Sequence, residues 1–172
     1  STTGCYNVAM GATAMGNSDV TGNDNVAIGR TTADALTTGA CNVAIGSSAL
    51  GAATIGVRNI AIGESAMSGV TTLQADNNIA IGLSALVGTS ATVGDNNIAI
   101  GNYAMDGVSS LAATENVFIG KHSGGGSWTG TASTKNVAVG NYTMQAAMNA
   151  DNQNVAIGYY AGAALETSNS TL

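Results

Sequence analysis

The sequence predicts an all-β protein, a parallel β-solenoid in which each short repeat forms one coil. A five-residue pattern of Asn, a β-branched residue, a small residue, an aliphatic residue and Gly occurs nine times in 172 residues. Successive copies lie 17 to 20 residues apart, which suits one turn of a β-coil and is too short for the helix pairs of most α-solenoids. The composition, with 24 Gly, no Pro and 8% charged residues, is typical of short strands joined by tight polar turns. We therefore expect one solenoid domain of about nine coils over residues 1–172.

The first and last residues of the pattern, which we call the pentad, have different expected roles. The asparagines are Asn7, Asn25, Asn42, Asn59, Asn78, Asn97, Asn116, Asn136 and Asn154. The glycines are Gly11, Gly29, Gly46, Gly63, Gly82, Gly101, Gly120, Gly140 and Gly158. Stacked asparagine side chains can cap turns and hydrogen-bond along the axis. The glycine is expected to supply a backbone angle or a close approach that other residues cannot.

Each coil is expected to begin with a strand made by its pentad. Period-2 alternation places the two aliphatic residues on one face and the central residue on the other, as in Val26, Ala27 and Ile28. Phe118 alone interrupts the central alanine column, which indicates that the space opposite it is not tightly closed. A small residue three positions after the glycine, usually followed by Leu or Met, predicts a second short strand. The rest of the coil, such as residues 16–24, is expected to be a return loop or a weaker third strand.

Burial energetics predict that the chain does not stand alone. A coil has about three large aliphatic side chains to bury, worth roughly 5 to 8 kcal/mol. Ordering costs about 1.5 kcal/mol for each residue of the coil, so one coil is not stable by itself. Stacking supplies a continuous core, but a thin roll with one Phe and one Trp would gain from burying a second face against other chains. We expect a homotrimer, because threefold symmetry is the natural arrangement for parallel rolls around an axis.

The charge and the cysteines limit the partners. A net charge of −6 and only four cationic side chains argue against nucleic acid, which needs clustered Lys and Arg. No apolar stretch approaches the roughly 20 residues of a membrane span, so we expect no membrane insertion. Cys5 and Cys41 lie two repeats apart and in different columns, which places them too far apart for a disulfide. We therefore predict two unpaired thiols.

The run Asn-Val-Ala-Ile-Gly followed by two variable residues and Ala occurs at Asn42 to Ala49 and at Asn154 to Ala161. It resembles the head repeat of trimeric autotransporter adhesins and is similar to repeats of bacteriophage tail fibres. The resemblance covers nearly the whole chain. It implies a left-handed parallel β-roll, three rolls packed side by side, and a fibre that projects from a virion or a bacterial cell surface to contact a host. The coils are longer than those of adhesin heads, which favours a phage fibre and leaves both origins open.

What the resemblance implies for function is non-enzymatic attachment. The expected activity is structural support and receptor binding by an extracellular fibre, with host surface glycans or proteins as partners. No cofactor and no enzymatic activity are expected.

The second residue after each glycine changes character along the chain and suggests a binding site. Hydroxyl side chains come first, and rings replace them at Tyr103, His122, Tyr142 and Tyr160, with Tyr159 adjacent. Aromatic faces suit the C–H surfaces of sugars, so a glycan-binding stripe is one interpretation. The alternative is that these rings pack between protomers or close the roll.

Two further features give weaker signals. The run Gly124-Gly125-Gly126-Ser127-Trp128 is predicted to protrude and to offer Trp128 as a contact point, unless the Trp folds back over an exposed edge. Asp and Asn cluster at residues 23–25, 76–78, 95–97 and 151–152, with the oxygen ligands that Ca²⁺ prefers. The calcium β-roll signature is absent and Asx turns explain the clusters, so no metal site is predicted.

The main alternative is an enzyme. Ile81-Gly82, Val87-Gly88 and Val93-Gly94 recur every six residues and resemble the left-handed β-helix of hexapeptide-repeat acyltransferases. The resemblance implies that His122, the only histidine, would act as general base at a subunit interface. The six-residue rhythm fails in most other coils, which favours the fibre. An ice-binding solenoid would need a regular Thr ladder, and the hydroxyl column ends at Ser84.

Overall fold

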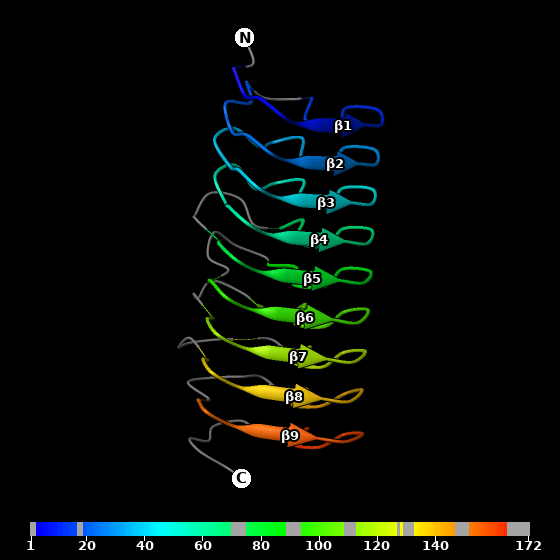
Figure 1. The fold of residues 1–172 in the computed structure, drawn as a ribbon. Helices are drawn as coiled ribbons and strands as arrows, with labels where there is room; N and C mark the ends of the chain where they lie inside the picture. Colours follow the sequence, from blue (N-terminus) through cyan, green and yellow to red (C-terminus); the bar gives the residue numbers. More distant parts are fainter. Residues whose placement is uncertain are drawn as a thin grey trace.

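The computed structural model is a β-solenoid in which every pentad forms one strand of a single parallel sheet (Figure 1). The structure describes residues 3–16, 19–69, 75–88, 94–108, 113–126, 128, 133–146 and 152–164. The strands are β1 (Val8–Met10), β2 (Val26–Ile28), β3 (Val43–Ile45), β4 (Ile60–Ile62), β5 (Ile79–Ile81), β6 (Ile98–Ile100), β7 (Val117–Ile119), β8 (Val137–Val139) and β9 (Val155–Ile157). The predicted all-β fold is confirmed. Within these ranges there is no helix long and apolar enough to span a membrane.

The pentads stack in register along the whole sheet. Each strand pairs in parallel with the next one, and equivalent residues are partners, so that Ala61 pairs with Ala80 and Ala80 with Ala99. Each strand contacts only the strands before and after it, in the order of the sequence. The prediction that equivalent positions line up as columns along one axis is therefore confirmed.

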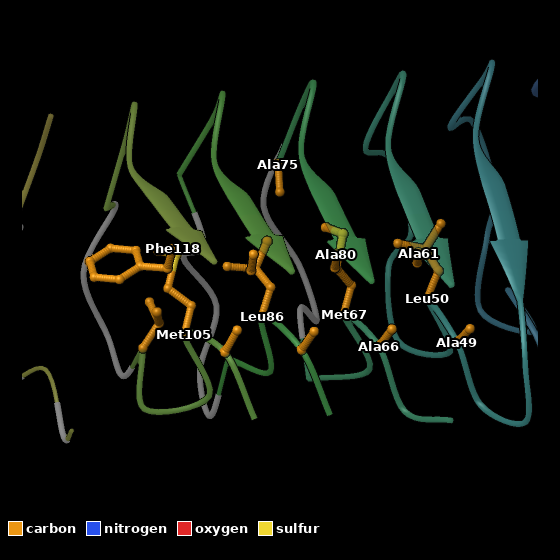
Figure 2. Close-up of a cluster of buried hydrophobic side chains, with 14 of the residues drawn as sticks. Ala49, Leu50, Ala61, Ala66, Met67, Ala75, Ala80, Leu86, Met105 and Phe118 are labelled. Atoms are coloured by element: carbon orange, nitrogen blue, oxygen red, sulfur yellow. The ribbon is translucent and has the colours of Figure 1, made fainter. Parts of the chain in front are cut away.

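The interior of the solenoid is narrow and is lined mainly by alanine. The central residue of each strand from β2 to β9 is buried, and the residues on either side of it are half-exposed or exposed. The fourth residue after the glycine adds one large buried side chain in most coils. These side chains are Leu50, Met67, Leu86, Met105 and Met144, and Figure 2 shows four of them beside the strand alanines.

The expectation of about three buried large aliphatic side chains per coil is therefore wrong. The strand aliphatics, such as Ile79 and Ile81, lie on the outer face of the sheet, and only alanine fits the inner face. The interior is filled instead by the Leu or Met after the turn and by other buried side chains such as Leu36 and Val108.

The predicted second strand after the glycine is a tight turn. Residues two and four after the glycine adopt positive φ, as Tyr103 (59°) and Met105 (54°) do, in a region that L-residues rarely enter. The amide of Tyr103 donates to the carbonyl of Leu83 in the preceding coil, while that of Met105 donates to Ser123 in the following coil. Because of this turn, one backbone amide donates to the preceding coil and the other donates to the following coil. These hydrogen bonds offset the energetic cost of the positive φ.

The pentad glycine has both of the roles predicted for it. Gly82 has a φ of +132°, and a Cβ added there would lie 2.6 Å from the backbone carbonyl of Gly101. Any side chain would therefore push the next coil away, so the coil spacing itself requires glycine at this position.

The pentad asparagines form a buried ladder that joins the coils. The side-chain amide nitrogen of Asn97 donates to Oδ1 of Asn78 at 3.1 Å and to the carbonyl of Ala113 at 2.8 Å. Oδ1 of Asn97 accepts from the backbone N–H and the side-chain amide of Asn116, both at 3.1 Å. Asn97 is fully buried, yet both the nitrogen and the oxygen of its side-chain amide have hydrogen-bond partners in the neighbouring coils. The predicted axial stacking of asparagine is confirmed.

The ladder predicts a large cost for Asn97→Ala. The change leaves Asn116 and Ala113 with unpaired buried polar groups at about 1 to 3 kcal/mol each, so the free energy of unfolding should fall by about 3 to 5 kcal/mol. Urea unfolding followed by circular dichroism measures it. Asn96→Lys is the matched control, because the exposed Asn96 and Lys135 occupy the same column with the same φ of 61°. Equal destabilisation by the two variants would contradict the ladder's role.

In the coil that begins at Asn116, the large and the small core side chains have exchanged positions. Phe118 replaces the strand alanine, and Gly124 stands where neighbouring coils carry Leu or Met. A Cβ added to Gly124 would lie 2.6 Å from the Phe118 ring, so the ring occupies the space that the missing side chain leaves. The prediction that the space opposite Phe118 is open is confirmed, and Gly124 is the reason.

This exchange predicts strong coupling between positions 118 and 124. Phe118→Ala alone should cost about 3 to 5 kcal/mol because it leaves a cavity. Gly124→Met alone should clash with the ring, whereas the double variant restores the pattern of the neighbouring coils, in which Met105 adopts the same backbone conformation. The double variant should therefore be more stable than either single variant in urea unfolding. Additive losses would show that the two positions do not share one space.

Candidate functional site

The predicted aromatic residues form one continuous stack, which we call the aromatic column: Tyr103, His122, Tyr142 and Tyr160. The ring centroids of Tyr103 and His122 are 5.0 Å apart, and their planes differ by 9°. His122 and Tyr142 are 5.5 Å apart at 16°, and Tyr142 and Tyr160 are 5.0 Å apart at 9°. The sequence prediction that these four side chains come together is confirmed.

Backbone hydrogen bonds between coils hold the column in place. The amide of Tyr142 donates to the carbonyl of Lys121 at 2.8 Å, and the amide of Tyr160 donates to Asn141 at 3.1 Å. Each ring follows a glycine-initiated turn whose geometry repeats in every coil, so the rings repeat with it. Earlier in the same column the hydroxyls of Thr31 and Ser48 are 2.9 Å apart, which shows the same registration with smaller side chains.

Stacking limits what the column can bind. His122 has a ring neighbour on each face, and so does Tyr142, so these two rings present mainly their edges to the surroundings. A sugar cannot lie flat against a ring whose faces are covered. A flat glycan platform along the whole column is therefore incompatible with the stacking. Tyr160, the last ring of the column among the described residues, is 48% exposed.

Tyr159 adds a second exposed ring at that end. Its centroid is 4.5 Å from that of Tyr160 and 6.0 Å from that of Tyr142, and its plane is at 84° to both. Since Tyr142 and Tyr160 are themselves 5.0 Å apart, these distances place Tyr159 beside the stack and not beyond it. Tyr159 is 70% exposed and meets the stack edge to face.

A second column lies next to the rings and is made by the residues that directly follow each pentad glycine. In three successive coils its members are Lys121, Asn141 and Tyr159. The backbone N–H of Lys121 donates to Oδ1 of Asn141 at 2.9 Å, so the two residues stack in register. The Lys121 ammonium group lies 5.7 Å from the centroid of the Tyr142 ring, a cation–π distance.

Asp106 is a carboxylate close to the rings whose pKa is shifted. Burial raises the pKa of the Asp106 carboxyl, while the nearby His122 and a hydrogen bond to the backbone of Asp106 itself act in the opposite direction. Its Oδ1 atom is shielded from solvent and has no hydrogen-bond partner among the described residues. Ionised Asp106 is therefore a local source of instability beside the aromatic column.

The phenol of Tyr160 stays protonated well above neutral pH. Desolvation raises its pKa most, and the charge and hydrogen bonding of Tyr159 and the charge of Tyr142 raise it further. The end of the column is therefore an uncharged aromatic surface under physiological conditions.

Trp128 does not protrude, and the hypothesis that it is an exposed contact point is wrong. It is 2% exposed, its ring packs edge-on against Phe118 with centroids 5.6 Å apart, and its Nε1 donates to the carbonyl of Gly124 at 2.9 Å. The glycines before it let the chain fold inward to the space beside Phe118. Ser127 lies outside the described residues.

The Asp and Asn clusters bind backbone amides of neighbouring coils. Oδ1 of Asp76 accepts from the amide of Val57 at 2.9 Å, and Oδ1 of Asp95 accepts from the amide of Asp76 at 2.8 Å. Asn152 does the same for Thr134, while Asp151 lies outside the described residues. No group of three or more metal-ligating side chains occurs in the described ranges. Sequence reasoning expected local Asx turns here and missed that the bonds run between coils.

Two remaining features are not built sites. A cavity of about 200 Å³ beside the first described coil is lined by Ala9, Ala14 and Met15, whose equivalents line the core of later coils, so it is a continuation of the interior. Cys5 and Cys41 are both exposed and unpaired, as predicted.

Comparisons of the chain with protein-family models, with curated proteins and with solved structures find no match. The function must therefore be argued from the geometry alone.

The raised pKa of Asp106 predicts the pH dependence of stability. A carboxyl whose pKa is higher in the folded than in the unfolded protein contributes stability at low pH that is lost as the pH rises through the folded value. Asp106→Asn should therefore be more stable than the parent at neutral pH, and the difference should shrink as the pH falls from the folded pKa toward the reference value of 3.8, below which it should be lost. Thermal unfolding between acidic and neutral pH measures it.

Asp24→Asn is the control for that measurement, because it removes the same charge from an exposed side chain. A constant difference between Asp106→Asn and the parent across the pH range would contradict the assignment to Asp106 ionisation.

Proposed function

We propose that this chain is a non-enzymatic, receptor-binding segment of a homotrimeric extracellular fibre, belonging to a virion or to a bacterial surface. The observation that carries the proposal is the apolar outer face of the sheet. In this proposal three left-handed rolls pack side by side through that face, and the remaining surface is displayed to a host cell.

The outer sheet face consists of the second and fourth residues of every pentad. It contains only Val, Ile and Met, and it runs from β1 to β9 without a charged residue. In β2 to β6 both of these columns are half-exposed, and Ile119 in β7 is 36% exposed. A continuous apolar stripe along one side of a rod is unusual for a solitary soluble chain and typical of an interface.

The repeat determines which partner fits this stripe. A second copy of the chain has the same coil spacing, so a rotation axis parallel to the stacking direction lets every coil meet its own equivalent. The chain carries a net charge of −6, which makes copies repel one another elsewhere and favours contact through the uncharged face. Three copies around such an axis give each roll two neighbours.

The acyltransferase remains the alternative, with His122 as the general base. Tyr103 and Tyr142 cover the faces of the His122 ring and leave free its edge, where the nitrogens of a general base lie, so the stack is compatible with both functions. The apolar outer face of the sheet is what favours the fibre. Acyl-CoA turnover that disappears in His122→Ala would favour the enzyme.

The proposal predicts a trimer that a single charge on the outer sheet face disrupts. Native mass spectrometry of the parent should give the mass of three chains. Ile98→Lys in β6 points its charge into the interface and should give single chains with an unchanged β-sheet circular dichroism spectrum, because the side chain lies outside the core. A monomeric parent would overturn the assembly.

Thr38→Lys is the matched control, since it adds the same charge at an exposed position away from the strands and should remain trimeric. Adsorption of the fluorescently labelled parent to a panel of bacterial and animal cells tests attachment. Failure to adsorb to any of them would argue against the receptor-binding part of the proposal.

A further inference from the structure

We infer that the column Lys121, Asn141 and Tyr159 beside the aromatic stack binds acidic oligosaccharides, with Tyr159 against the apolar face of a pyranose ring and Lys121 on a carboxylate. This inference rests on the proposed function, because it names the chemical class of the host-surface ligand. It also assigns the binding to a few residues, whereas the sequence suggested the column as a whole.

The first support is free aromatic surface that is already fixed in position. Tyr159 is 70% exposed, and its column is exposed in the two preceding coils as well, at Lys121 and Asn141. Edge-to-face contacts to Tyr160 and Tyr142, with ring centroids 4.5 and 6.0 Å away, hold the Tyr159 ring in place. A ligand therefore meets ordered rings, and little side-chain entropy is lost on binding. Rings with an apolar body and a phenol tip suit a sugar, which presents C–H groups on one face and hydroxyls around its edge.

The second support is the polar column that leads to Tyr159. Lys121, Asn141 and Tyr159 occupy the same position in consecutive coils, and the coils rise by about 4.8 Å each. Oδ1 of Asn141 accepts the Lys121 amide, and its amide group makes no other hydrogen bond within the described residues. That group is at an exposed position, where it can donate to sugar hydroxyls between the aromatic end and Lys121. A short oligosaccharide lying along the axis would contact all three.

The third support is the charge of Lys121. The residue is exposed, its ammonium group lies 5.7 Å from the centroid of the Tyr142 ring, and no carboxylate pairs with it in the described ranges. By contrast, Lys135 lies 3.8 Å from Glu115. In a chain of net charge −6, an unpaired cation beside exposed rings favours a ligand that carries its own carboxylate. The inference therefore predicts a preference for acidic over neutral sugars, and not merely sugar binding.

The repeat supplies substitutions that its own coils already tolerate. Ser47 and Ser48 occupy the columns of Tyr159 and Tyr160 in an earlier coil. Tyr159→Ser, Tyr160→Ser and Lys121→Ser should therefore fold. Arg30→Ser is the matched control for Lys121, because Arg30 is a cation in the same column several coils away, and Tyr6→Ser removes a distant exposed tyrosine.

The experiment uses immobilised oligosaccharides that contain sialic or uronic acids, each paired with its carboxyl-reduced neutral counterpart. The parent should bind at least one acidic member about fivefold more tightly than its counterpart. Tyr159→Ser should weaken binding to both members by about tenfold, through loss of ring contact. Lys121→Ser should abolish the preference and leave neutral binding unchanged, and both control variants should bind as the parent does.

Several results would overturn the inference. These are no binding by the parent, equal binding of both members of every pair, or losses that the control variants share. Cell adsorption that persists after glycosidase treatment would identify a protein receptor, so the inference would fail while the fibre function stands. A parent that is monomeric and adsorbs to no cell would instead remove the proposed function itself.

Discussion

Axial hydrogen bonding between coils is the interaction on which the rest of this structure depends. The strands are three residues long, and no coil contains a core of its own. The buried amide of each pentad asparagine is satisfied only because the preceding and following coils supply its partners. The same stacking brings the backbone at Gly82 so close to Gly101 that no side chain fits. Asparagine and glycine therefore recur for one reason, which is that both are required at the spacing of a parallel ladder.

That spacing also decides where the apolar residues lie. A coil closed by a tight turn encloses a narrow interior, in which the strand contributes a small central residue and the large buried side chains come from outside the strand. The larger strand aliphatics, such as Ile79 and Ile81, face outward. A globular protein with this composition would bury them, whereas this chain arranges them as a stripe along a rod. The exposed apolar stripe therefore follows from the geometry of the coil and not from an excess of hydrophobic residues.

The parts of the fold that repetition encodes could be predicted from the sequence. The strand positions, the register, the asparagine ladder and the aromatic column all follow from aligning equivalent residues. The turn could not be predicted, because Tyr103 and Met105 adopt a positive φ that sequence rules assign to Gly or Asn, and only hydrogen bonds to other coils stabilise it. Trp128 was misplaced because its glycine-rich surroundings indicated a loop. Phe118 and Gly124 depart from their columns within the same coil, and that paired departure was the available signal for an inward Trp.

The same physics that creates the aromatic column restricts its chemistry. Register places each ring over the next one, which orders the rings and covers their faces at the same time. A uniform column therefore offers little ring face along its length, and a neighbouring column that changes residue type offers more. Tyr159 is such a change, because it follows Lys121 and Asn141 in one column and stands beside the stacked rings of Tyr142 and Tyr160. In the proposed site this break in the pattern supplies the specificity, and the pattern itself supplies the rigid frame that positions it.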